Sequence, residues 1–242
     1  MKMFKEVKAR LFNIYQGNKS YSQCGEDIIL DYLIDALKIK NLRYLDIGAN
    51  DPIIFNNTYL FYCKGYRGVC IEPDPISFHH LQKIRKEDKC FNIGIGIDKE
   101  IKYAKFFMMT SSTLNTFSEE RANNYVKSEC YGKQTIERVA NVKLVPINEI
   151  LRSCFNPWPN LVSLDVEGLE FSILKTIDFT EFRPELFCIE TAFYAGNKSL
   201  HKTEDIIRFM ESNGYYLYAD TFINSIFVED QIWNSYAKPT PS

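Results

Sequence analysis

Two acidic residues stand directly behind short apolar runs in the first third of the chain. Asp46 ends one run and opens a small-residue turn that contains Gly48 and Asn50, and Glu72 ends the next run. Gly48 would let the backbone approach a ligand without a Cβ in the way, and Asp46 could accept hydrogen bonds from a cationic or hydroxylated group. An acid in the position of Glu72 can bind both hydroxyls of a ribose. The pattern predicts a ligand that contains a nucleoside.

The turn after Asp46 lacks the glycine pattern of loops that bind a pyrophosphate. There is no GxGxxG, and Asp51-Pro52 would place a carboxylate where a phosphate should lie. This favours an adenosine ligand without phosphates, and S-adenosylmethionine fits that description. An NAD-type oxidoreductase shares the strand, the glycine turn and the acid, so it stays open as an alternative. A binding protein without catalysis stays open as well.

A second group of acids follows two later apolar runs. Asp165, Glu167 and Glu170 come after residues 161–164, and Glu190 ends residues 186–190. Converging carboxylates can serve base catalysis, bind a cation or hold substrate hydroxyls. We expect Glu170 to cap or pair within its own helix.

Of these acids, the candidates for catalysis are Asp165, Glu167 and Glu190, with His201 as a rival general base. Asp165 and Glu190 could instead share one divalent metal ion, and carboxylate oxygens suit Mg²⁺ or Mn²⁺.

These residues must be positioned by β-strands that alternate with helices. Apolar runs predict seven strands, at 43–47, 68–72, 90–95, 161–165, 186–190, 215–219 and 225–228, and helical patterns lie between most of them. The last two strands are close enough to form an antiparallel hairpin. The expected fold is α/β, a doubly wound, mainly parallel seven-stranded sheet, in which ligands bind beyond the carboxyl ends of the strands.

We expect the chain to form a single domain over residues 1–242. Residues 105–145 interrupt the alternation and are interpreted as an insertion over the ligand-binding edge, with a plain surface excursion as the alternative. Residues 1–20 are interpreted as a helical extension that packs on the domain or on a partner.

Composition narrows the class of protein. With 45% hydrophobic residues and a formal net charge of −2, the chain has the balance of a globular protein and lacks the basic excess of nucleic-acid-binding proteins. No apolar stretch is long enough for a signal peptide or a membrane span. None of the seven cysteines forms a CxxC pair. We therefore expect free thiols and a cytoplasmic location.

Four blocks together resemble the FkbM family of methyltransferases. They read YSQCGED at 21–27, DIGAN at 46–50, EPD at 72–74 and DVEGLE at 165–170. In the family, DxGAN is often followed by a second glycine, whereas here Asp51-Pro52 follows. The resemblance implies a Rossmann-like class I methyltransferase fold that uses S-adenosylmethionine. It also implies methyl transfer to a hydroxyl oxygen of a polyketide or of a sugar in a bacterial surface polysaccharide.

The resemblance further implies roles for individual residues at the cofactor. Asp46 and the turn from Gly48 to Asn50 would lie near the methionine moiety, and Glu72 would hold the ribose. The remaining expected contacts are the adenine with Asn92 and Ile93, and a segment that closes over the cofactor with Gln23. The expected acceptor is a sugar, in particular a nucleotide-activated sugar for capsule or surface polysaccharide, with a polyketide or another small molecule as the alternative. A homo-oligomer stays open.

Overall fold

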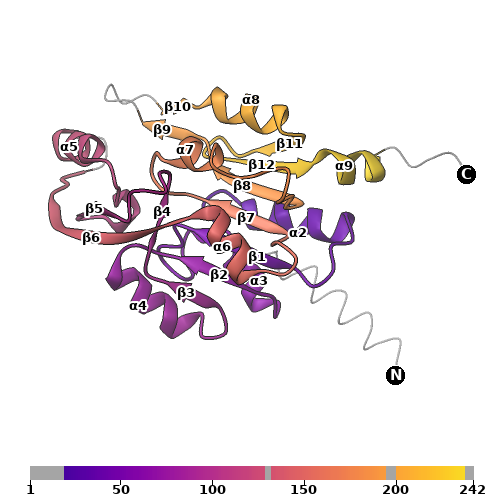
Figure 1. The fold of residues 1–242 in the computed structure, drawn as a ribbon, viewed down its shortest axis with the longest axis horizontal. Helices are drawn as coiled ribbons and strands as arrows, with labels where there is room; N and C mark the ends of the chain where they lie inside the picture. The colour runs from indigo at the N-terminus through magenta and orange to yellow at the C-terminus, as the bar shows by residue number, and fades with distance from the viewer. Residues whose placement is uncertain (1–18, 129–131, 195–199, 238–242) are drawn as a thin grey trace, which may run out of the picture.

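A seven-stranded sheet forms the centre of the protein (Figure 1). The computed structural model describes residues 19–128, 132–194 and 200–237. Strands lie in the order β11-β12-β8-β7-β1-β2-β3; the five from β8 to β3 are parallel, and β12 is antiparallel to both β8 and β11. This arrangement confirms the predicted doubly wound sheet with an antiparallel hairpin at its C-terminal end. The bounds are β1 Arg43–Ile47, β2 Arg67–Ile71, β3 Lys89–Phe91, β7 Leu161–Leu164, β8 Leu186–Glu190, β11 Tyr215–Asp220 and β12 Asn224–Glu229.

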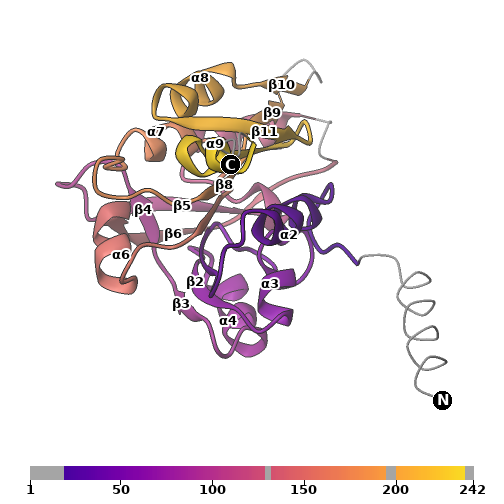
Figure 2. The ribbon, with the colours of Figure 1, turned by 90° about the vertical axis from the view of Figure 1, so that its right-hand side faces the viewer.

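Helices cover both faces of this sheet (Figure 2). One face is covered by α6 (Ile147–Cys154), α7 (Glu170–Leu174) and α8 (Glu204–Ser212), which share a buried apolar core with the strands. On the other face, a second core holds α2 (Glu26–Ala36), α3 (Tyr59–Cys63) and α4 (Pro75–Ile84), and α9 (Asp230–Ala237) packs against it. Because both faces are buried, the central strands are apolar almost throughout instead of alternating with polar residues.

Successive side chains of β1 nevertheless point to opposite faces of the sheet and so belong to different cores. Leu45 and Ile47 belong to the core of α6, α7 and α8, whereas Tyr44 belongs to the core of α2, α3 and α4. Successive side chains in a strand point to opposite faces. Asp46 therefore lies on the same face of the sheet as Tyr44, the face covered by α2, α3 and α4.

The third predicted strand, residues 90–95, is divided in the structure. β3 ends at Phe91, and Gly94–Gly96 forms β4 in a separate three-stranded sheet. Between them, the Asn92 side chain donates hydrogen bonds to the carbonyl oxygens of Glu72 and Pro73, both at 2.8 Å. The apolar run is continuous in the sequence, but these bonds turn the chain out of the main sheet.

The segment interpreted as an insertion builds most of that second sheet. β5 (Tyr103–Met109) pairs antiparallel with β6 (Ile136–Pro146), and β6 pairs parallel with β4. Between β5 and β6 lie a short 3₁₀ turn, Ser112–Leu114, and α5, Glu119–Lys127. Figure 1 shows β5, β6 and α5 together at one end of the main sheet. A further pair, β9 (Ala192–Tyr194) and β10 (Leu200–Lys202), follows β8.

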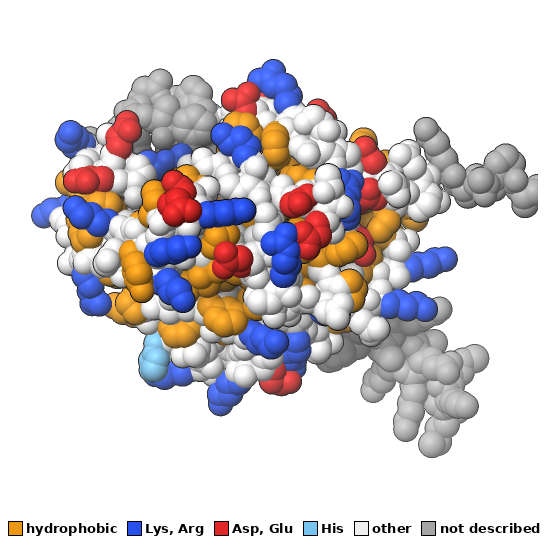
Figure 3. All heavy atoms as spheres, viewed as in Figure 1, with side chains coloured by type: hydrophobic (Ala, Val, Ile, Leu, Met, Phe, Trp, Pro, Cys, Tyr) orange, Lys and Arg blue, Asp and Glu red, His pale blue; other side chains and the backbone are white. Residues whose placement is uncertain are grey.

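The ends of the chain, its cysteines and its surface were also subjects of expectations from the sequence. Of the N-terminal extension, residues 1–18 lie outside the described residues. Within the described residues, no helix is long and apolar enough to cross a membrane. Six cysteines are free thiols, and the seventh, Cys130, is also outside the described part. The face seen in Figure 3 carries acidic and basic side chains side by side, without a large patch of either sign.

Candidate active site

A cavity of about 300 Å³ lies at the carboxyl edge of the main sheet. This size is at the lower end of the range for small-molecule sites. Its lining contains seven of the residues singled out in the sequence: Gln23, Gly48, Asn50, Glu72, Asp165, Glu167 and Glu190. The 105–145 segment adds Phe106, Ser112, Thr113, Leu114, Asn115, Phe117, Arg121 and Tyr125. The acids that follow three different strands therefore lie around one space, with the 105–145 segment over it.

Gly48 stands at the point where the strand order reverses, between β1 and β7. Its φ is +84°, and a Cβ added there would lie 1.7 Å from the carbonyl oxygen of Asp165. Only glycine tolerates both the left-handed backbone and this close approach. The sequence suggested that Gly48 leaves room for a ligand; the structure shows that it also leaves room for the end of β7.

Glu72 holds the neighbouring turns through both of its carboxylate oxygens. One oxygen accepts the N–H of Asn50 and the other accepts the N–H of Asp74, each at 2.7 Å. Burial raises the pKa of Glu72 to about 8, although the two backbone hydrogen bonds oppose that rise. Each oxygen keeps a further lone pair, so the side chain that lines the cavity can still accept hydrogen bonds from ribose hydroxyls.

Asp46 is not among the residues that line the cavity, and its expected place near the methionine moiety stays a prediction. Its carboxylate is 4% exposed and accepts hydrogen bonds from the Thr58 hydroxyl at 2.7 Å and the Asn56 amide at 3.4 Å. Burial raises the pKa of Asp46, and the nearby Arg85 guanidinium opposes that rise. Asp46 points away from the cavity because its position in β1 places it on the face of the sheet that α3 and α4 cover.

Asn92 and Ile93 also lie outside the cavity lining. The amide of Asn92 donates to two main-chain carbonyls, as described above, and Ile93 packs against the core of α6, α7 and α8. That these two residues lie near the adenine therefore stays a prediction. Pro73 lines the cavity beside Glu72.

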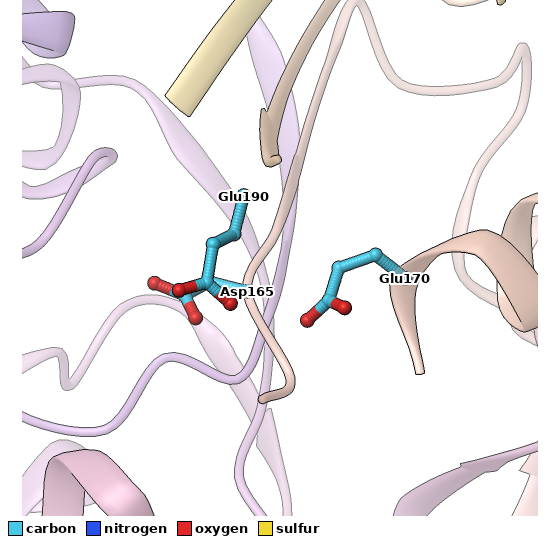
Figure 4. A group of neighbouring side chains, drawn as sticks. All are labelled: Asp165, Glu170 and Glu190. Atoms are coloured by element: carbon cyan, nitrogen blue, oxygen red, sulfur yellow. The ribbon is translucent and has the colours of Figure 1, made fainter. Parts of the chain in front are cut away.

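The acids that follow β7 and β8 form a cluster (Figure 4). Asp165, Glu170 and Glu190 each offer a carboxylate oxygen, and these oxygens lie within 4.8 Å of one another. Burial raises the pKa of Asp165 to about 7 and, with the Asp165 charge, raises the pKa of Glu190 well above its usual range. Like charges this close favour proton sharing or a bound cation. Asp165 and Glu190, the predicted pair, are thus brought together.

Glu170 approaches the pair from the first turn of α7. Its carboxylate accepts the N–H groups of Val166 and Gly168 at 2.9 and 3.0 Å, so it braces the turn before α7, whereas the sequence led us to expect a cap or an ion pair within its own helix. Figure 4 shows its carboxylate directed toward Asp165 and Glu190. Oxygens on opposite sides of one bound cation are about 4–5 Å apart for metal–oxygen bonds of about 2.0–2.6 Å. The three acids therefore have the donor atoms and the spacing that a divalent ion requires.

Glu167 faces the cavity from a strained turn and contacts α5. Its φ is +56°, and its Oε2 accepts a hydrogen bond from the Tyr125 hydroxyl at 3.0 Å. Burial raises the pKa of Glu167 to about 8, with the Asp165 charge as a further cause. Bulky residues with positive φ cost about 1–3 kcal/mol and concentrate at functional sites. Glu167 is therefore held in place by the 105–145 segment as well as by its own turn.

Arg121 and Tyr125 are cavity residues that the sequence reasoning missed. They lie one helical turn apart on α5, so they share a face. The Arg121 guanidinium lies against Gly168, where a Cβ would be 2.2 Å from Cζ, and Arg121 is the one basic side chain among the described residues that line the cavity. Their spacing of four residues was the available signal, but nothing in the sequence showed which face of that helix meets the acids.

The structure describes only the backbone of His201, the predicted rival general base. Its backbone lies in β10 and pairs with Phe193 of β9. Its side chain is outside the described part of the structure. The prediction of a rival general base at this position therefore stays a prediction.

Comparison with protein families gives one match. The model described as "Methyltransferase FkbM domain" matches residues 46–217, which include the turn after β1, Glu72 and the acids after β7 and β8. No curated protein matches the sequence.

Several solved structures are similar in fold at low identity. A TehB-like SAM-dependent methyltransferase from Corynebacterium glutamicum has 14% identity and a TM-score of 0.40, and the alignment covers 95% of this chain and 100% of that one. Monomeric WbdD has 13% identity and a TM-score of 0.44, over 85% of this chain and 40% of that one. Magnesium protoporphyrin IX methyltransferase from Synechocystis PCC 6803 has 10% identity and a TM-score of 0.41, over 88% and 86%.

Proposed function

This chain belongs to the FkbM family of methyltransferases and is an S-adenosylmethionine-dependent enzyme, and from that premise we propose that it methylates a hydroxyl oxygen of a sugar. The observation that carries the proposal is the position of the acid cluster. Asp165, Glu167 and Glu190 line the same cavity as the turn after β1 and Glu72. We call the part lined by Gly48, Asn50 and Glu72 the cofactor half, and the part lined by Asp165, Glu167 and Glu190 the acidic half. O-methylation of a weakly acidic hydroxyl needs a bound methyl donor and a group that removes the hydroxyl proton, and the two halves offer these.

The cofactor half fits the methyl donor in its chemistry. Gly48 and Asn50 present a turn without bulky side chains, and Glu72 offers carboxylate lone pairs to ribose hydroxyls. Gln23, from the segment before α2, closes the same side of the cavity. When bound, S-adenosylmethionine supplies an electrophilic methyl group on its sulfonium. The residues around it supply position, which accounts for much of the rate in such transfers.

The acidic half would remove the proton from the acceptor hydroxyl. A sugar hydroxyl has a pKa far above neutral, so it needs a general base or a metal ion. Asp165, whose pKa is raised to about 7, can accept a proton near neutral pH. Asp165 and Glu190 can also hold a divalent ion with Glu170, and such an ion would bind two neighbouring sugar hydroxyls and acidify one. We favour the metal, because three acids share the site while the described lining residues offer one basic side chain, Arg121, and none of the described ion pairs joins it to these acids.

The acceptor class is supported by the lining that the 105–145 segment provides. Ser112, Thr113 and Asn115 offer hydroxyl and amide groups, and Phe106 and Phe117 offer aromatic surface. Aromatic rings and polar side chains together suit a sugar, and we infer a nucleotide-activated sugar for a surface polysaccharide. The six free thiols support a cytoplasmic reaction.

Labelled S-adenosylmethionine tests this function directly. The wild-type chain would be incubated with a panel of nucleotide sugars and, separately, of hydroxylated polyketides, with Mg²⁺ or Mn²⁺ present, and the products separated and counted. Label in a sugar, stable to mild base as expected for a methyl ether, supports the proposal. Label that appears only in polyketide acceptors would replace the sugar by the alternative substrate class. Binding of NAD in place of S-adenosylmethionine, by calorimetry, would contradict the cofactor.

Glu190→Gln is the informative variant, since Gln keeps the size of the side chain but neither ionises nor binds a metal ion well. Its turnover should fall by about 10²- to 10⁴-fold, the usual scale for a general base. Glu181→Gln is the matched control, because Glu181 forms an exposed ion pair with Arg152 on the surface. The control should leave turnover unchanged.

A further inference from the structure

The side chain of Arg85 is completely buried, yet it lies outside the cavity. It stands at the end of α4 and is 0% exposed. All five of its N–H donors have acceptors: Asp88 Oδ2, the Pro52 carbonyl, Asn56 Oδ1, the Tyr44 hydroxyl and the Thr58 hydroxyl. The rings of Tyr44, Tyr59 and Tyr62 surround the guanidinium at 4.9–5.7 Å. A buried arginine with every donor satisfied holds several segments in one fixed arrangement.

Most of those acceptors belong to the loop that follows β1. Residues 52–58 of this loop lead from the cavity-lining turn into α3, and three of the five acceptors come from it: Pro52, Asn56 and Thr58. The Arg85–Asp88 ion pair, 2.8 Å long, keeps the charge of the guanidinium compensated within the core. Arg85 therefore ties this loop to α4 and β1 from the side opposite the cavity.

Asn56 carries the connection through to the cavity. Its Oδ1 accepts from Arg85 at 3.2 Å, and its Nδ2 donates to the carbonyls of Ala49 and Asp51, both at 3.1 Å. These two carbonyls flank Asn50, which lines the cavity and gives its N–H to Glu72. Asn50 has φ of +44°, a left-handed conformation that asparagine adopts more readily than most residues but less readily than glycine. Contacts on both sides of Asn50 stabilise it there.

We propose that Arg85 is a positioning residue for the methyl donor: acting through Asn56, it holds Asn50 in the left-handed conformation that shapes the cofactor half of the cavity. The buried Asp46 belongs to the same hydrogen-bond network, since its carboxylate accepts hydrogen bonds from the Asn56 amide and the Thr58 hydroxyl. The first acid of the sequence motif thus acts from behind the turn. This inference rests on the proposed use of S-adenosylmethionine.

Arg85→Lys is the first test. Lysine keeps a charge for Asp88, but its single ammonium cannot bond Asn56, Thr58 and Pro52 together in the plane that a guanidinium offers. The Kd for S-adenosylmethionine, measured by calorimetry, should rise about tenfold, the effect of losing one or two buried hydrogen bonds. The kcat at saturating cofactor should change by less than about threefold, because the acid cluster is untouched. A change in kcat with an unchanged Kd would overturn the proposal.

Arg67→Lys is the matched control. Arg67 also lies over the Tyr62 ring and pairs with an acid, Glu87, but it contacts no residue of the loop after β1. The control should bind the cofactor with the wild-type Kd. An equal rise in Kd in both variants would show a general loss of stability and would refute positioning. Failure of the wild-type chain to bind S-adenosylmethionine would instead count against the proposed function.

A second route does not depend on Arg85→Lys folding. Asn56→Ala leaves Arg85 with Asp88 and the tyrosine rings but removes the link to the turn, so it should raise the Kd about tenfold as well. Glycine adopts positive φ without help. In an Asn50→Gly background, Asn56→Ala should therefore raise the Kd less than about threefold. A tenfold rise that persists in that background would mean that the link does not act through the conformation of Asn50, and the proposal would fail.

Discussion

Replacing Asp165 with asparagine should make the protein less active and more stable at the same time. Burial beside Glu170 and Asp46 raises the Asp165 pKa from its ordinary 3.8 to about 7. A carboxyl with a raised pKa in the folded state costs stability once it ionises. The cost begins as pH rises above 3.8 and is complete above pH 7. At about 1.36 kcal/mol per pH unit, the shift corresponds to about 4 kcal/mol.

The asparagine variant would not recover all of that free energy. A buried amide still needs hydrogen-bond partners, and lacking them costs about 1–3 kcal/mol. We therefore expect Asp165→Asn to raise the free energy of unfolding by about 2 kcal/mol at about pH 9 and to change it little at about pH 3.5, where the acid is mostly protonated in both states. Turnover should fall by about 10²- to 10⁴-fold. Cofactor affinity should stay nearly the same, since Asp165 lies in the acidic half.

Urea unfolding at the two pH values, with EDTA present to keep the acids free of metal, measures the stability change. Asp178→Asn serves as the control, because the Thr180 hydroxyl lowers the pKa of that exposed carboxyl and its loss should not stabilise the protein. The reasoning would be refuted if Asp165→Asn were no more stable than the wild type at the higher pH. In that case the cluster would carry no charge strain and would need no proton or cation to balance it.

Three further outcomes follow from the same cavity. Glu72→Gln should raise the Kd for S-adenosylmethionine about tenfold, since it replaces one acceptor oxygen with an NH₂ donor and an unmade buried hydrogen bond costs about 1–3 kcal/mol; an unchanged calorimetric Kd would remove Glu72 from the ribose. Chelation should abolish turnover, and Mg²⁺ or Mn²⁺ should restore it, because all three candidate ligands offer oxygen; full activity in EDTA would leave Asp165 and Glu190 as metal-free bases. Tyr125→Phe removes the hydrogen bond to Glu167 and should raise the acceptor KM more than it raises the cofactor Kd, which steady-state kinetics with each substrate varied would decide.

The fold was predictable from the sequence because apolar runs and turn residues agree along most of the chain. Each of the seven strands of the main sheet has a counterpart in an apolar run. The exception is instructive, since residues 90–95 form one strand-like run that is divided by the hydrogen bonds of one side chain, Asn92. The run looks uniform in sequence, but β3 at the edge of the main sheet leaves Phe91 exposed, whereas β4 is buried in the other sheet.

The site was predictable only in part, for a related reason. The acids after β7 and β8 converge because parallel strands end at one edge, and this follows from the topology. Asp46 follows the same rule in sequence, yet its side chain points to the opposite side, toward Thr58 and the buried Arg85. A single position along a strand decides between the two directions. The contribution of Arg121 and Tyr125 depends on how α5 packs, and no motif encodes that packing.

The pairing of β4 with β6 has a consequence for the segment that lies between these strands. Gly94–Gly96 lies beside Leu144, Val145 and Pro146, so the chain leaves the main body and returns to it at one place. The segment between these two strands, which includes the cavity-lining residues of the 105–145 segment, is a closed excursion whose two ends are neighbours. Its contacts with the acids are local, since Tyr125 bonds Glu167 and Arg121 packs on Gly168, so a change in this segment would reshape the cavity and also shift Glu167.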